Sequence, residues 1–204
     1  MTDPKTSSTQ TLTRLADQLE SLPPEGWDVP SLCDGWQVRH VVAHVTMPAR
    51  YTPERFGAEM AAARGDFERA SSTIAARDAM RPVAEHLADL RSPVLHAWEA
   101  PGGGAAGALA HAVIHSLDVT LPLGLPDAAP PDAVLAVLTQ LTDAQGAMFG
   151  VELDGVRLEA TDADLTWGTG ETVRATGGEL VALVSGRTLP DGRSLPRARA
   201  AVSG

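Results

Sequence analysis

Apolar residues recur at the spacing of amphipathic helices through most of the chain. Leucines at positions 12, 15, 19 and 22 share one face of a first helix, which Pro23 and Pro24 end. The same pattern predicts further helical segments before residue 148. They are Asp34 to Pro48, with Asp34 as the cap, Thr52 to Met80, Pro82 to Trp98, Ala105 to Thr120 and Val134 to Ala147.

The pattern changes after residue 147, where short alternating segments predict strands. Val156–Ala160, Leu165–Trp167 and Thr172–Ala175 alternate, and an apolar stretch, Glu179–Gly186, predicts a short helix behind them. We therefore expect a mainly α protein with a small α+β C-terminal part. The predicted domains are a helical bundle over residues 1–147 and a small sheet-plus-helix domain over residues 148–204.

Composition narrows the kind of partner. A formal net charge of -10 and a pI near 4.9 disfavour nucleic acid and anionic membranes. No uninterrupted apolar run approaches the ~20 residues that a bilayer requires, and the N-terminus lacks a signal-peptide pattern. A single cysteine, Cys33, suits a reducing compartment. We expect small-molecule partners, no membrane, a cytoplasmic location, and a monomer or homodimer; arginine in place of lysine suggests a GC-rich, actinobacterial genome.

One predicted helix carries a stripe of polar residues suited to metal binding. On a helix His111 and His115 are offset by roughly 40°, and Asp118 falls back within about 20° of His111. Two imidazoles one turn apart can hold one divalent ion, which in an enzyme needs a third protein ligand and an open position. His44 is the best candidate, because it stands in an otherwise apolar helical segment where an unpaired polar group is costly to bury.

Several segments together resemble the mycothiol-dependent maleylpyruvate isomerase family, within the wider DinB-like or YfiT-like superfamily of metal-binding helical bundles. Leu32–Arg39 with Val42–Val45 is similar to the Cys-Pro-Gly-Trp…His signature of that family. His115–Asp118 with Pro122–Gly124 is similar to its second metal helix, and Leu158–Gly168 with Leu180–Arg187 to its C-terminal domain. The resemblance implies a DinB-like four-helix bundle followed by the small sheet-plus-helix domain.

The resemblance also implies roles for particular residues. His44 and His115 are metal ligands, and Arg187 is the C-terminal arginine that contributes to activity. His111 replaces a glutamate of the isomerase, so the ligand set is all histidine. His40 replaces an aspartate of the signature, so the resemblance does not extend to the isomerase's own substrate.

Zinc is the expected ion, because three imidazoles and an open position suit a tetrahedral metal; nickel, iron or cobalt fit the same donors. Mycothiol, a low-molecular-weight thiol, is the expected second cofactor, ionised on the metal to attack a small electrophilic substrate. We expect Asp118 and His40 to support ligands from outside the coordination sphere. Arg187 either anchors a carboxylate of thiol or substrate, and so serves both binding and catalysis, or is an ordinary helix-end cation.

The resulting hypothesis is a metal- and mycothiol-dependent cis-trans isomerase or S-transferase. Two alternatives stay open on the same residues. One is a hydrolase that uses a metal-bound hydroxide, and the other is a non-catalytic protein that binds a metal or a small molecule.

Overall fold

The structure is a computed structural model that describes residues 3–197, so the outermost residues of both predicted domains, 1–2 and 198–204, lie outside it. The chain divides into two compact units between Ala129 and Pro130. The protein is mainly α with a small α+β C-terminal part, as the sequence pattern predicts.

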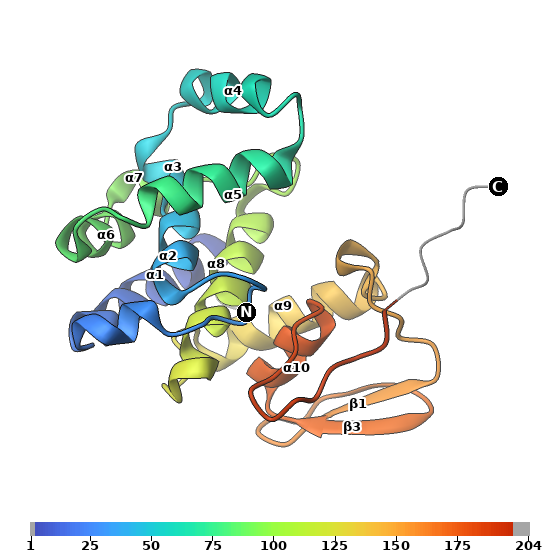
Figure 1. Ribbon diagram of the computed structural model, residues 1–204. Coiled ribbons are helices and arrows are strands. Elements are labelled where there is room, and N and C mark those ends of the chain that lie inside the picture. Colours follow the sequence, from blue (N-terminus) through green and yellow to red (C-terminus); the bar gives the residue numbers. More distant parts are fainter. Residues whose placement is uncertain (1–2, 198–204) are drawn as a thin grey trace. The chain divides into compact units, whose positions relative to one another are not determined.

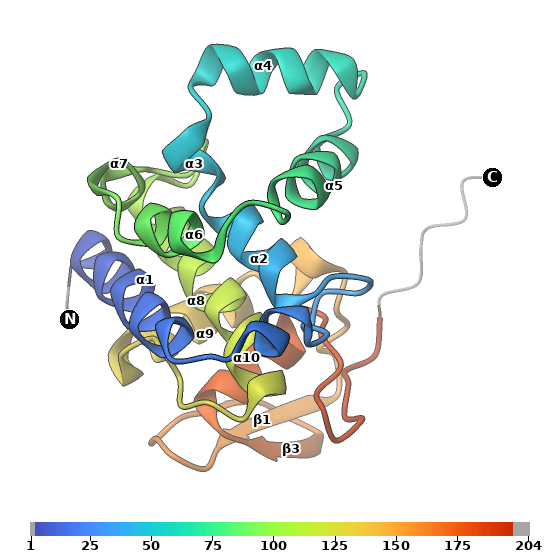
Figure 2. The same cartoon turned by 60° about the vertical axis from the view of Figure 1, so that its left-hand side comes forward.

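The N-terminal unit is a bundle of helices (Figure 1). The long helix α8 packs against both α1 and α2, and α2 packs in turn against α5. Figure 2 shows α1, α2 and α8 side by side from a second direction. The elements are α1 (Pro4–Glu20), a 3-10 helix (Pro24–Asp28), α2 (Val38–Val45), α3 (Met47–Arg50), α4 (Pro53–Ala62), α5 (Phe67–Asp78), α6 (Val83–Leu90), α7 (Pro93–Ala97) and α8 (Gly104–Leu123).

Core packing follows the predicted leucine face of α1. Leu12, Leu15 and Leu19 are buried together with the valines of α2, in a cluster that Trp27 completes. Because five of the eight residues of α2 are apolar and buried, its residue His44 is carried into the interior. The packing therefore places a titratable ring inside the bundle.

Two predicted helices are each broken in two. Thr52 to Met80 forms α4 and α5, because Arg64 and Gly65 both take positive φ values, 59° and 81°. Pro82 to Trp98 forms α6 and α7, with Ser92 capping the second helix. None of the residues of α4 is buried, so it contributes little to the core.

Helix α8 alone among the described helices is long and apolar enough to span a bilayer by length and composition. Of its most apolar window, 61% is buried inside the protein, and it packs against α1 and α2. The core helix of a bundle meets the same criteria, and α8 carries two histidines and an aspartate. We therefore interpret it as the central helix of the N-terminal unit.

The C-terminal unit joins helices to a three-stranded sheet of order β2-β1-β3. Strand β1 pairs antiparallel with β2 and parallel with β3, and the buried positions of β1 alternate as predicted. The elements are α9 (Pro131–Asp143), a 3-10 turn (Ala147–Phe149), β1 (Val156–Ala160), β2 (Thr166–Gly168), β3 (Glu171–Ala175) and α10 (Gly177–Val184).

Helix α9 belongs to this second unit, where it packs against α10. The sequence pattern assigned the α9 segment to the first domain and put the boundary after residue 147. Helical periodicity identifies α9 as a helix but does not say which partner buries its apolar face. The domain assignment of residues 1–147 and 148–204 itself stays a prediction.

Candidate metal centre

Three histidine rings from two helices converge inside the N-terminal unit. The ring centroids of His44 and His111 lie 5.0 Å apart, and His115 lies 4.7 Å from each of them. The Nε2 atoms of His44 and His111 are 3.1 Å apart, and one ring nitrogen of each histidine lies within 4.8 Å of the others. The structure thus brings together the three residues expected to bind a metal.

Two side chains fix the orientation of these rings from behind. The Ser71 hydroxyl of α5 lies 2.9 Å from Nδ1 of His44, and Asp118 Oδ2 lies 2.8 Å from Nδ1 of His115. Both Ser71 and Asp118 are buried. With Nδ1 engaged in both rings, Nε2 is the nitrogen through which His44 and His115 would bind a metal, as is usual for histidine ligands.

Ser71 was not expected from the sequence. A serine within an alanine-rich helical stretch gives no signal of its own, since its partner lies 27 positions away along the chain. The proximity arises only because α2 packs against α5. Asp118, by contrast, was expected beside a histidine ring from its position three residues after His115.

One nitrogen pair of the donor set has about the spacing that a tetrahedral ion requires. At metal–nitrogen bonds of about 2.0–2.1 Å, two ligand nitrogens lie about 3.3–3.4 Å apart. The 3.1 Å between the Nε2 atoms of His44 and His111 is within a few tenths of an ångström of that value. Burial lowers the pKa of His111 well below its usual range, and the neighbouring His115 and His44 lower it further. A neutral imidazole is the form that binds a metal.

His40 occupies a different place. Its Nδ1 accepts a hydrogen bond of 3.2 Å from the backbone N–H of Gln37, so the ring closes the N-terminal cap of α2. Burial lowers its pKa, with a further lowering by Arg39. Gln37, not Asp34, is the cap residue, because Asp34 lies further upstream in the preceding loop. Support of a ligand by His40 stays a prediction.

Cys33 meets the buried carboxylate that supports His115. Its Sγ lies 3.0 Å from Oδ2 of Asp118. The backbone carbonyl of Asp118 also accepts a hydrogen bond of 3.0 Å from the N–H of Leu32. These contacts fix the loop before α2 to α8.

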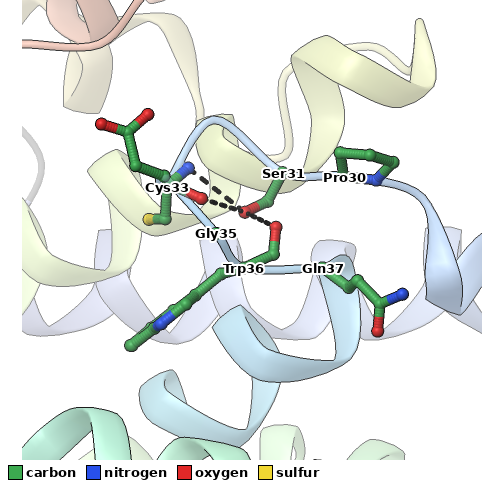
Figure 3. Close-up of a pocket in the computed structure, with 7 residues that line it drawn as sticks. Pro30, Ser31, Cys33, Gly35, Trp36 and Gln37 are labelled. Carbon is green, nitrogen blue, oxygen red and sulfur yellow. Dashed lines mark hydrogen bonds between the residues drawn. The ribbon is translucent and has the colours of Figure 1, made fainter.

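The same loop borders a shallow, open cavity of about 310 Å³, lined by Pro30, Ser31, Cys33, Asp34, Gly35, Trp36 and Gln37. Figure 3 shows the Ser31 hydroxyl hydrogen-bonded to the backbone of Cys33 and Trp36. The histidines are not among these lining residues. The cavity adjoins them through Trp36, whose ring lies 5.4 Å from that of His44, and through Cys33 on Asp118.

Arg187 lies in the C-terminal unit, just after α10. Its guanidinium donates a hydrogen bond of 3.1 Å to the backbone carbonyl of Ser185 and lies 5.9 Å from the centre of the Phe149 ring. These contacts suit a helix-end cation. A role for Arg187 in the metal centre stays a prediction.

Fold and site together describe a helical bundle with an all-histidine cluster, followed by a small α+β unit. Residues 9–116 match the model of the mycothiol maleylpyruvate isomerase N-terminal domain, which is just over half of the chain. The chain belongs to that family, and the matched segment contains His44, His111 and His115.

Solved structures give a more distant comparison. The mycothiol-dependent maleylpyruvate isomerase is 16% identical, with a TM-score of 0.44, and covers 96% of this chain and 94% of its own. A histidine-to-alanine mutant of that enzyme matches with the same identity and coverage and a TM-score of 0.45. No curated protein matches the chain.

Proposed function

We propose that this protein is a metal- and mycothiol-dependent enzyme that carries out a thiol-assisted cis-trans isomerisation or an S-transfer on a small electrophile. The observation that carries the proposal is the convergence of three imidazoles, with one ring nitrogen of each within 4.8 Å of the others. Family membership supports the thiol. The only cysteine, Cys33, contacts Asp118, so the reacting sulfur is better supplied by a cofactor.

The chain's own residues have distinct parts in this proposal. His44, His111 and His115 would hold the ion, with zinc as the first choice and nickel, iron or cobalt as alternatives. A bound divalent ion would act there as a Lewis acid that lowers the pKa of a thiol. Ser71 and Asp118 keep two of the imidazoles aimed at the shared centre.

Arg187, expected from the sequence to bind a carboxylate, is proposed as the anchor for a carboxylate of the substrate, since mycothiol carries none. A guanidinium suits this role, because its planar fork binds carboxylates through two parallel hydrogen bonds. The test is Arg187→Lys, which keeps the charge and loses the fork. This substitution should raise the KM for the substrate while leaving the metal content of the protein unchanged.

The central experiment has two stages. The protein is purified, its metal is measured by mass spectrometry, and mycothiol is titrated into the metal-loaded form by calorimetry. We expect one ion per chain, binding of mycothiol, and loss of the ion in His44→Ala. His96→Ala, on α7, is the control that should retain it.

Turnover decides the reaction class. Isomerisation that requires mycothiol and returns it unchanged supports the isomerase, and incorporation of the thiol into product supports the transferase. Ester or amide hydrolysis without thiol would instead support a hydrolase, and ligand binding without any turnover would support a binding protein. The cytoplasmic location and the monomeric or homodimeric state stay predictions.

A further inference from the structure

Two tryptophans border the histidine cluster. Trp36, in the loop before α2, lies 5.4 Å from His44 between ring centroids, and Trp98, just after α7, lies 5.4 Å from His111. Both pairs meet edge to face, with interplanar angles of 61°. A continuous series of ring contacts therefore runs from Trp36 through two ligand histidines to Trp98.

Core packing accounts for these indoles only in part. Trp27 is an example of a tryptophan with only a packing role, because it is 1% exposed and lies within the core cluster. Trp36 and Trp98 each keep part of their surface accessible, although both contact buried or half-buried histidines. Trp36 also lines the loop cavity. Both rings thus combine contact with a proposed metal ligand and partial exposure.

Helix α8 supplies no positive charge to the cluster, so binding of a substrate carboxylate would depend on Arg187, the anchor proposed above. Helix α8 contains no lysine or arginine, and the whole chain carries a net charge of -10. Four arginines, on α2, α3 and α5 and just before α6, form ion pairs with carboxylates. These pairs are Arg39 with Asp28, Arg50 with Asp78 and Asp89, Arg77 with Glu59 and Asp78, and Arg81 with Glu85 and Asp89.

We propose that Trp36 and Trp98 are specificity-determining residues and that the site accepts an electrophile bearing an aromatic ring or a similar flat apolar group. This inference rests on the proposed function, for which it names the substrate class. Aromatic rings pair favourably with indoles in edge-to-face or offset geometry, with a gain beyond simple burial. The ion and the thiol supply the chemistry, and the indoles select what reaches them.

Binding of unreactive ligands tests the inference independently of turnover. Benzylacetone and pentan-2-one are both ketones without a conjugated double bond. They differ in one group, a phenyl ring in benzylacetone and a methyl group in pentan-2-one. Their affinities for the metal-loaded protein are measured by calorimetry. We expect benzylacetone to bind at least about tenfold more tightly, and Trp98→Leu to remove most of that preference while keeping the metal.

Two variants sharpen the result. Trp98→Phe should retain part of the preference, because an aromatic ring remains. Trp167→Leu removes a partly exposed tryptophan of β2 in the C-terminal unit and should leave the preference unchanged. Equal affinity of the two ketones for the wild type, or an unchanged preference in Trp98→Leu, would overturn the inference.

The corresponding enones separate this inference from the proposed function. Benzylideneacetone and ethylideneacetone are tested with mycothiol, and their kcat/KM values are compared. Thiol-dependent turnover without preference for the aryl enone refutes the specificity and leaves the proposed function standing. Tryptophan-dependent binding of benzylacetone without metal or thiol dependence supports an aromatic site and removes the proposed function.

Discussion

At the scale of single residues, the hydroxyl behind His44 gives the sharpest test of the metal centre. Ser71→Ala removes the group that lies 2.9 Å from Nδ1 of His44. Loss of such a support for a ligand histidine typically weakens metal binding by about 10–100-fold. Competition with a chromophoric chelator measures the affinity. Ser72→Ala is the matched control, because Ser72 is its neighbour on α5 and should leave the affinity unchanged.

A second residue-scale prediction concerns His86, which is 1% exposed and stacks on Trp27 with ring centroids 6.0 Å apart. Burial, assisted by the charges of Arg50 and Arg81, lowers the pKa of His86 to about 4. The unfolded chain therefore binds this proton more readily than the folded protein. The free energy of unfolding should fall as the pH is lowered from about 6.5 towards 4, by about 3 kcal/mol from this group.

His86→Phe keeps a ring against Trp27 and removes the titration. Urea unfolding at pH values from 7 to about 4 should show a smaller loss of stability in this variant, by about 3 kcal/mol. The carboxylates titrate alike in both proteins, so the difference isolates His86. Parallel pH profiles would contradict the prediction.

The sequence predicts those site residues that lie close together along the chain, and misses those that only packing brings together. His111, His115 and Asp118 follow from the spacing of a single helix, and His44 from a polar residue in an apolar one. Ser71 and Trp98 gave no comparable signal, because each reaches the cluster only through the packing of separate elements. Local periodicity predicts which face of a helix a residue occupies. It does not predict which residue of another element packs against that face.

At the scale of elements, strand β1 has the predicted bounds, because alternation of apolar and polar residues marks a half-buried strand directly. The break between α4 and α5 was missed, although Gly65 followed by Asp66 combines a helix-ending glycine with a capping aspartate. Alanine-rich flanks obscured it, since they continue a helical composition through the turn.

Arg50 gives the prediction that belongs to this scale, because it connects α3 to α5 and α6. Its guanidinium pairs with Asp78 at 3.1 Å and Asp89 at 3.0 Å and donates to the carbonyl of Ala43 at 2.7 Å. The Arg50 side chain is only 10% exposed. Arg50→Met removes one of the two arginines that pair with each carboxylate, because Arg77 also pairs with Asp78 and Arg81 with Asp89. It should lower the free energy of unfolding by about 1–3 kcal/mol.

Urea denaturation measures that loss, and Arg69→Met is the control. Arg69 is exposed on α5, where a substitution should change stability by no more than about 0.5 kcal/mol. Equal effects of the two substitutions would mean that the Arg50 network does not stabilise the bundle. Because Ala43 precedes His44, metal affinity in Arg50→Met should also fall.

At the scale of the whole molecule, all three proposed ligands belong to one compact unit and Arg187 to the other. A ligand that binds only the folded state stabilises it by mass action, by about 2.7 kcal/mol at a free concentration a hundred times its Kd. Metal should therefore raise the melting temperature of the unit that contains the histidines. Calorimetric melting with zinc and with a chelator measures the shift.

Substitution of a proposed metal ligand and substitution of the proposed anchor should have different effects in that experiment. His44→Ala should abolish the zinc-dependent shift, while Arg187→Ala should retain it and lose activity, because the proposed anchor contributes to binding of carboxylates and not to binding of the ion. If Arg187→Ala also lost the shift, Arg187 would contribute to metal binding itself. If His44→Ala kept it, the stabilising ion would lie elsewhere, and the three imidazoles would be a hydrogen-bonded cluster in the core.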